Sequence, residues 1–133
     1  IVADIYGARP VDLTIVDGIR SMSGGEGYWN RGVEMVKPNL LLAGRDGLAT
    51  DAVCTAAMGF DPKADHGEPP FPGHNHLKLL ASVNVGTIDL DKIEVVGLPL
   101  KKAVHHYAAA TGGGRPTRHL AHGPACPHHG DTA

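Results

Sequence analysis

The chain has 133 residues, and its 18 glycines and 10 prolines are an excess of turn-formers. With 42% hydrophobic residues, this composition favours one loop-rich globular domain over a disordered chain. Twelve basic residues against fourteen acidic ones, with no long Lys/Arg cluster, exclude nucleic acid as an expected partner. No apolar run approaches the roughly 20 residues of a membrane helix, so membrane insertion is not expected.

The two cysteines, Cys54 and Cys126, have no C-x-x-C spacing. They therefore offer neither a disulfide scaffold nor the ligand set of an iron–sulfur cluster. The compartment stays open between the cytoplasm and export through a signal that the given sequence does not contain. Because the chain starts at Ile1 and within a helical pattern, we expect it to be part of a larger α/β domain.

The first predicted elements are the end of a helix and two or three strands. Apolar residues at i,i+4 spacing in residues 1–8 predict the end of a helix that Gly7 closes. Short β-branched runs predict buried strands over 11–17 and 39–43, and an edge strand is expected around 33–36.

Capping residues mark two helices in the middle of the chain. Asp46 as N-cap and Gly59 after the last turn bracket a predicted helix over 47–58. Asn75 follows a proline-rich loop and can cap a second helix over 76–83.

The last predicted elements are a third strand over 92–96 and an amphipathic helix over 100–110. Together the elements predict an α/β domain over 1–110, with an at least three-stranded mixed or parallel sheet flanked by helices. The Gly-, Pro- and His-rich residues 111–133 have few large apolar side chains to offset the entropy of ordering, which predicts a flexible tail.

Candidate ligand-binding residues follow the predicted strands, because ligands of open α/β sheets bind beyond the carboxyl ends of the strands. Glycines let the backbone approach a ligand closely, and an arginine beside a helix N-terminus suits a carboxylate or phosphate. A flexible surface loop and a surface ion pair are the alternative interpretations. The candidates are Gly18, Gly24, Gly25, Glu26, Gly27, Trp29, Arg45, Asp46 and Asn75.

Carboxylates and imidazoles supply the candidates for chemistry. Asp17, Glu26 and Asp51 are oxygen ligands suited to a divalent cation, although Asp17 can equally cap a turn and Asp51 can lie on a solvent-facing side of its helix. Asp17 and Asp51 could also act as acid or base, and His74 or His76 could move protons. The two histidines diverge on a helix, so we do not expect them to share a metal.

Several segments together resemble a known family. They are VDLTIVDGIRSMSGGEG at 11–27, KPNLLLAGRDGLATDAVCTAAMGFDP at 37–62, and PGHNHLKLL with VGTIDLDKIEVVG up to Gly97. These motifs are similar to the bacterial and archaeal domain-of-unknown-function family numbered 362, over roughly residues 1–97. The resemblance implies an α/β domain of which this chain is the carboxyl-terminal part. Some relatives carry ferredoxin-like cysteine clusters or a twin-arginine export signal, and this chain shows neither.

Three kinds of function follow from these patterns. The first is binding of a small anionic molecule, with or without a divalent cation, at the carboxyl ends of the strands, and catalysis there stays open. The second is a noncatalytic module that docks on an upstream part of the same polypeptide or on a partner chain, which predicts exposed apolar strand edges. The third is an accessory part of an iron–sulfur redox protein whose cluster lies outside this sequence.

Overall fold

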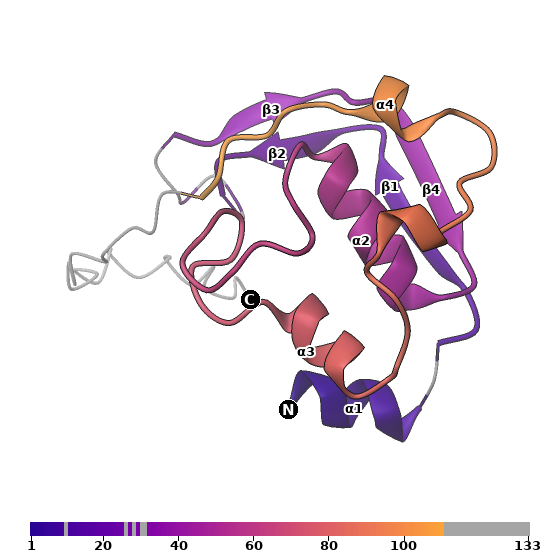
Figure 1. Ribbon diagram of the computed structural model, residues 1–133. Coiled ribbons are helices and arrows are strands. Elements are labelled where there is room, and N and C mark those ends of the chain that lie inside the picture. Colours follow the sequence, from indigo (N-terminus) through magenta and orange to yellow (C-terminus); the bar gives the residue numbers. More distant parts are fainter. Residues whose placement is uncertain (10, 26, 28, 30–31, 111–133) are drawn as a thin grey trace, which may run out of the picture.

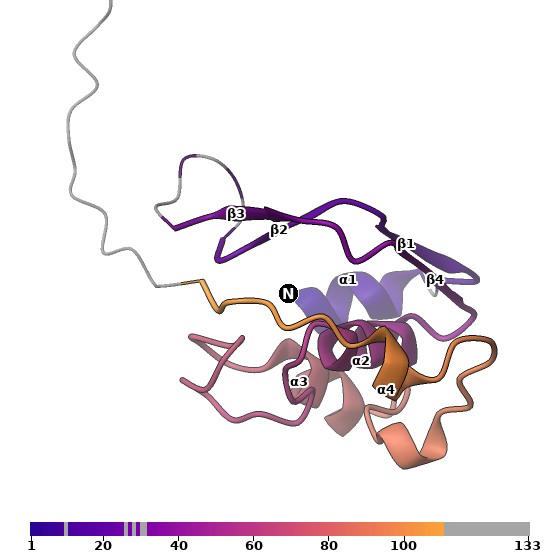
Figure 2. The same ribbon diagram turned by 90° about the horizontal axis from the view of Figure 1, so that it is seen from above.

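Four α-helices and two small sheets form two layers in the part of the chain that this computed structural model describes (Figure 1). Both sheets lie on the same side of the helices (Figure 2). None of the described helices combines the length and the apolar character needed to cross a bilayer. The structure describes residues 1–9, 11–25, 27, 29 and 32–110. The predicted tail over 111–133 lies outside them, so the boundary at residue 110 stays a prediction.

The main sheet pairs β1 (Thr14–Gly18) with β4 (Leu40–Gly44) in antiparallel register. The structure thus confirms a strand within each of the two predicted apolar runs. Alternate residues of both strands are exposed, however, and Ile15 and Leu41 keep 64% and 68% of their surface in solvent. The expectation that these strands are buried is therefore wrong for one face of the sheet.

A second antiparallel sheet pairs β2 (Ser21–Ser23) with β3 (Glu34–Val36). The edge strand expected around 33–36 is confirmed, whereas β2 is too short and polar to stand out in the sequence. Since β2 and β3 turn the chain back between β1 and β4, the main strands run antiparallel. The prediction of one mixed or parallel sheet of at least three strands is wrong, although the α/β class is right.

The central helix is α2 (Gly47–Ala57), and eight of its eleven residues are buried. The Asp46 carboxylate accepts a hydrogen bond from the Ala49 amide at 3.0 Å, which confirms the predicted N-cap. Gly59 has φ of +86°, the left-handed conformation that ends many helices. Small residues on α2 allow close packing, and Thr50 sits so near Gly44 that a Cβ there would collide with it.

The short helix α3 (His76–Ser82) begins at a buried asparagine. Asn75 is 4% exposed, and its side-chain oxygen accepts from the Leu77 and Lys78 amides in the first turn of α3 at 2.9 and 3.3 Å. Its side-chain nitrogen donates to the carbonyls of Pro62 and Ala64, both at 2.9 Å. One side chain thus caps α3 and fixes the proline-rich loop before it.

The hydrophobic core lies among the helices and this loop rather than under the sheets. Helix α1 (Val2–Ala8) packs Ala3 and Tyr6 against it, which confirms the predicted N-terminal helix, although Gly7 lies inside the helix and does not close it. The buried cluster consists of Leu48, Ala52, Ala64, Phe71, Leu77, Leu80 and Ile88.

Two elements predicted near the carboxyl end are wrong. The run over 92–96 forms no strand, because it begins within the 3₁₀ helix η1 (Leu90–Lys92) and has no backbone hydrogen bonds to β4 among the described residues. The helix predicted over 100–110 is reduced to α4 (Leu100–Ala103). The apolar patterns of residues 92–96 and 100–110 do not show which backbone groups elsewhere in the fold will form hydrogen bonds with these residues.

Residues 104–110 instead run beside β2 and the end of α2. The amides of His105 and Tyr107 donate to the carbonyls at the end of α2 at 2.8 and 2.9 Å. The Ala108 amide donates to the Ser23 hydroxyl at 2.7 Å. These tertiary hydrogen bonds replace the intrahelical ones and account for the shorter helix.

Replacing Asn75 should destabilise the whole fold. We expect Asn75→Ala to lower the free energy of unfolding by about 2–4 kcal/mol, because two loop carbonyls and two helix amides lose their partner. Asn75→Asp should cost less, since it keeps the acceptor that caps α3 while losing the donor to the loop. Urea denaturation measures both, with the exposed Ser82→Ala on the same helix as control. An Asn75→Ala protein as stable as the control would contradict this assignment.

Candidate functional site

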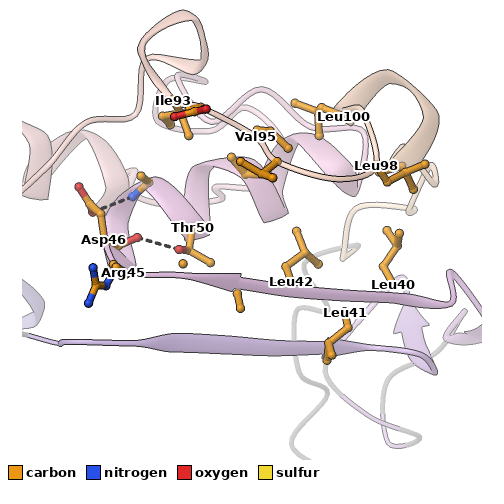
Figure 3. A pocket seen from close by; sticks show the side chains of 17 residues that line it. Leu40, Leu41, Leu42, Arg45, Asp46, Thr50, Ile93, Val95, Leu98 and Leu100 are labelled. Atoms are coloured by element: carbon orange, nitrogen blue, oxygen red, sulfur yellow. Dashed lines mark hydrogen bonds between the residues drawn. The ribbon is translucent and has the colours of Figure 1, made fainter.

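A groove of about 390 Å³ lies between β4, α2 and residues 93–100 (Figure 3). Figure 3 shows Leu40 and Leu42 pointing from β4 into the groove, whereas Leu41 points to the opposite side of the strand. The body of the groove is apolar. The side chains that make it so are Leu40, Leu42, Val53, Ile93, Val95, Leu98 and Leu100.

The polar residues of the groove are Arg45, Asp46, Thr50 and Glu94. The Asp46 carboxylate caps α2, and the Thr50 hydroxyl donates to the Asp46 carbonyl at 2.7 Å, so both serve the start of the helix. The Arg45 guanidinium lies beyond the end of β4 and not between the apolar side chains (Figure 3). One cation and two carboxylates therefore belong to the polar lining.

The groove also follows a free strand edge. No backbone hydrogen bond joins β4 to residues 93–98 in the described part of the chain. The sequence predicts Arg45 and Asp46 at a binding site, and both line this groove, but it does not predict the apolar walls. The apolar run at 92–96 was the available signal, and it was assigned to a strand.

Asp17 and Gly18 lie at a different hollow, of about 80 Å³, which Cys54 and Tyr107 also line. The Asp17 carboxylate accepts a hydrogen bond from the Ile19 amide at 2.9 Å, so it caps the turn after β1. The structure therefore does not bring Asp17 together with the residues of the larger groove.

A backbone hydrogen bond attaches the first part of the glycine-rich loop to the rest of the fold. Gly24 has φ of +88°, and its amide donates to a carbonyl of the segment after α4 at 3.0 Å. Gly25 is half-buried, and Gly27 is covered by the ring of Trp29, which itself is largely exposed. Glu26 lies outside the described residues. None of the described loop residues lines the larger groove.

Asp51 and His76 are the two catalytic candidates that the fold brings into electrostatic contact, across α2 and α3. Neighbouring protein removes water from around the Asp51 carboxyl and raises its pKa above the usual value, while the His76 charge opposes that shift. The His76 ring meets Phe71 edge-on at 5.6 Å between centroids. His74 packs against His66 instead, at 5.0 Å.

The expected cation site finds no support in the structure. Among the described residues, no group of three or more His, Cys, Asp or Glu side chains is arranged to hold a metal ion. Of the three predicted cation ligands, Asp17 uses its carboxylate to cap the turn after β1, and Asp51 lies within α2. Glu26 lies outside the described residues.

Cys54 is a free, half-buried thiol of α2. Burial and, to a smaller extent, the Asp51 carboxylate raise the pKa of this thiol to about 11. At neutral pH it is therefore protonated and a poor nucleophile.

Alkylation of Cys54 should be slow in a Cys126→Ala background. At about pH 8 the thiolate fraction should be roughly 100-fold below that of a thiol with the ordinary pKa. Asp51→Asn should speed the reaction, because it removes the second cause of the shift, and Asp91→Asn is the control. Iodoacetamide labelling followed by mass spectrometry gives the rates across pH. A rate equal to that of free cysteine would contradict the shift.

Nothing among the curated proteins or the solved structures matches the chain. A family model does match its N-terminal part, from α1 to the penultimate residue of α2. The sequence motifs carried the resemblance further, to about residue 97, and this later part lies beyond the match. Residues 1–56 match the family described as Domain of unknown function (DUF362), which confirms the resemblance for this part of the chain.

Proposed function

We propose that this domain is a noncatalytic interaction module that docks on an apolar protein surface through the outer face of its main sheet. The outer face is the side of β1 and β4 that points away from the helices. One observation carries the proposal, namely that Ile15 and Leu41 are exposed there to 64% and 68%. Large apolar side chains that are exposed together on one face often mark a protein–protein interaction site.

The apolar character of both faces supports the same proposal. Antiparallel sheets with one solvated face normally alternate apolar and polar residues. Here Val16 and Leu42 face the helix side, and the alternate positions Ile15 and Leu41 are also large and apolar. Leaving such a side chain in water forgoes about 1.5–3 kcal/mol that its burial would provide. A sheet of this kind gains stability when a second surface covers it.

The scatter of the catalytic candidates also favours binding over catalysis. The Asp17 side chain caps the turn after β1, and His74 packs on His66 in the proline-rich loop. Of the four catalytic candidates, only Asp51 and His76 are in electrostatic contact with each other, and no group of three or more His, Cys, Asp or Glu side chains in the described chain is arranged to hold a metal ion.

The outer face should bind a dye that detects apolar surface. With dilute protein and anilinonaphthalene sulfonate, we expect Ile15→Lys and Leu41→Lys to reduce dye fluorescence severalfold while circular dichroism stays unchanged. Leu79→Lys is the matched control, because Leu79 is 52% exposed on α3. If all three variants bind the dye like the wild type, the outer face is not the accessible apolar surface and the proposal fails.

Binding of a small molecule in the groove is a second candidate function. Its support is the apolar lining of Leu40, Leu42, Val95 and Leu98, together with a volume of about 390 Å³. Such a groove suits a ligand with an apolar body. The anionic ligand expected from Arg45 remains a prediction, and the carboxylates of Asp46 and Glu94 in the same lining oppose it.

Decanol and decanoate separate these ligand types. We expect decanol to bind the groove at least as tightly as decanoate, because Arg45 is offset by two carboxylates. Isothermal titration calorimetry measures both, with Val95→Asp as the groove variant and Val83→Asp on α3's end as control. Clearly tighter decanoate binding that Arg45→Met abolishes would instead assign the anionic ligand to Arg45.

A further inference from the structure

We propose that His66 and His74 together bind one divalent transition-metal ion, such as Zn²⁺, between their rings. The rings lie edge to face, with 5.0 Å between their centroids and 64° between their planes. Within the described residues, this is the one contact between two histidine rings. Both residues are exposed to solvent, so an ion can reach them. The site lies in the proline-rich loop and does not depend on the docking face proposed above.

The spacing of the two rings matches that of two ligands on one metal ion. Zinc–nitrogen bonds to histidine are about 2.0–2.1 Å long, and a tetrahedral ion holds two of them at about 109°. This geometry places the centres of the two rings about 5 Å apart. The torsion that turns a histidine ring is soft. Each exposed ring can therefore turn a nitrogen towards the space between them without a movement of the backbone.

Hydrogen bonds hold the backbone beside each histidine. Next to His66, the Gly67 amide donates to the carbonyl of the buried Phe71 at 2.9 Å. Next to His74, the Asn75 side chain makes its four hydrogen bonds to the loop and to α3. Because the loop already brings the two rings together, little ordering remains to oppose binding of an ion.

The ligand set selects the class of metal. The carboxylates nearest in sequence have other partners, since Asp65 pairs with Lys78 and Glu68 accepts from the Asp65 amide at 2.8 Å. No group of three or more metal-binding side chains occurs in the described part of the chain, so the protein supplies two nitrogen ligands and water completes the shell. Imidazole nitrogens suit Zn²⁺, Cu²⁺ and Ni²⁺, whereas Mg²⁺ and Ca²⁺ take oxygen ligands.

A bound ion would connect the two ends of a loop that belongs to the core. Ala64 and Phe71 of this loop are members of the buried cluster. The ring pair exists only in the folded loop, so an ion shared by both rings stabilises the folded state. We therefore expect Zn²⁺ to raise the urea concentration at which the protein unfolds.

Proton–nitrogen NMR spectra of the imidazole rings in the full 133-residue chain test the proposal. The spectra must resolve individual rings, because the sequence contains nine histidines. We expect added Zn²⁺ to change the signals of His66 and His74 along one common titration curve. Mg²⁺ should leave both signals unchanged.

Phenylalanine variants separate metal binding from ring packing. His66→Phe and His74→Phe keep an aromatic ring in the contact and remove both ring nitrogens. Each should weaken Zn²⁺ binding at the remaining histidine at least about tenfold and abolish the rise in the urea midpoint. His76→Phe is the matched control, because the His76 ring packs on Phe71 instead.

Two kinds of result overturn the shared site. The first is no change in either ring, or a His66 response that His74→Phe leaves intact, which would mean that each ring binds the ion on its own. The second is a urea midpoint that Zn²⁺ raises equally in the wild type and in all three variants, which would place the stabilising ion elsewhere. Dye binding at the outer face is a separate readout, so either proposal can fail while the other stands.

Discussion

The four hydrogen bonds of the Asn75 side chain join two parts of the chain that both contribute to the hydrophobic core. The residue is buried, and it joins the start of α3 to the carbonyls of the preceding loop. The core depends on that junction, because Ala64 comes from the loop and Leu77 and Leu80 come from the helix. With this side of the molecule fixed, α2 is covered on one flank by the helices and on the other by the main sheet. A buried amide that uses both its donors and its acceptor also leaves little capacity for a ligand.

Elements with strong local signals could be predicted from the sequence. Asp46 and Gly59 bracket α2, and Asn75 marks the start of α3, since capping is decided by neighbouring residues. Strand pairing could not be predicted. The apolar runs of β1 and β4 are typical of strands covered on both faces, and their antiparallel pairing depends on β2 and β3, which lie between them in the chain. The segment after η1 and the segment after α4 were assigned wrongly for the same reason. Their backbone partners, or the lack of them, lie far away in the chain.

The candidate site shows the same division. Arg45 and Asp46 could be located, because the helix start is visible in the sequence, and both line the groove. The apolar wall opposite β4 could not be located from the sequence. No local pattern shows that residues 93–98 lie beside the edge of β4 without forming backbone hydrogen bonds to it in the described chain. Asp51 and His76 were chosen for their chemistry, and the fold brings them within electrostatic reach. Asp17, in contrast, is a predicted ligand residue whose carboxylate caps the turn after β1, away from the groove.

The contact between Ala108 and Ser23 joins residues 85 positions apart. Closing so long a loop is costly in entropy until the intervening helices have shortened the distance. The segment after α4 therefore joins two places that contribute no residue to the buried core cluster, the short β2–β3 sheet and the carboxyl end of α2 after Ala52. Cleavage of the backbone just after Ala103 would open both at once while leaving the core around Asn75 intact.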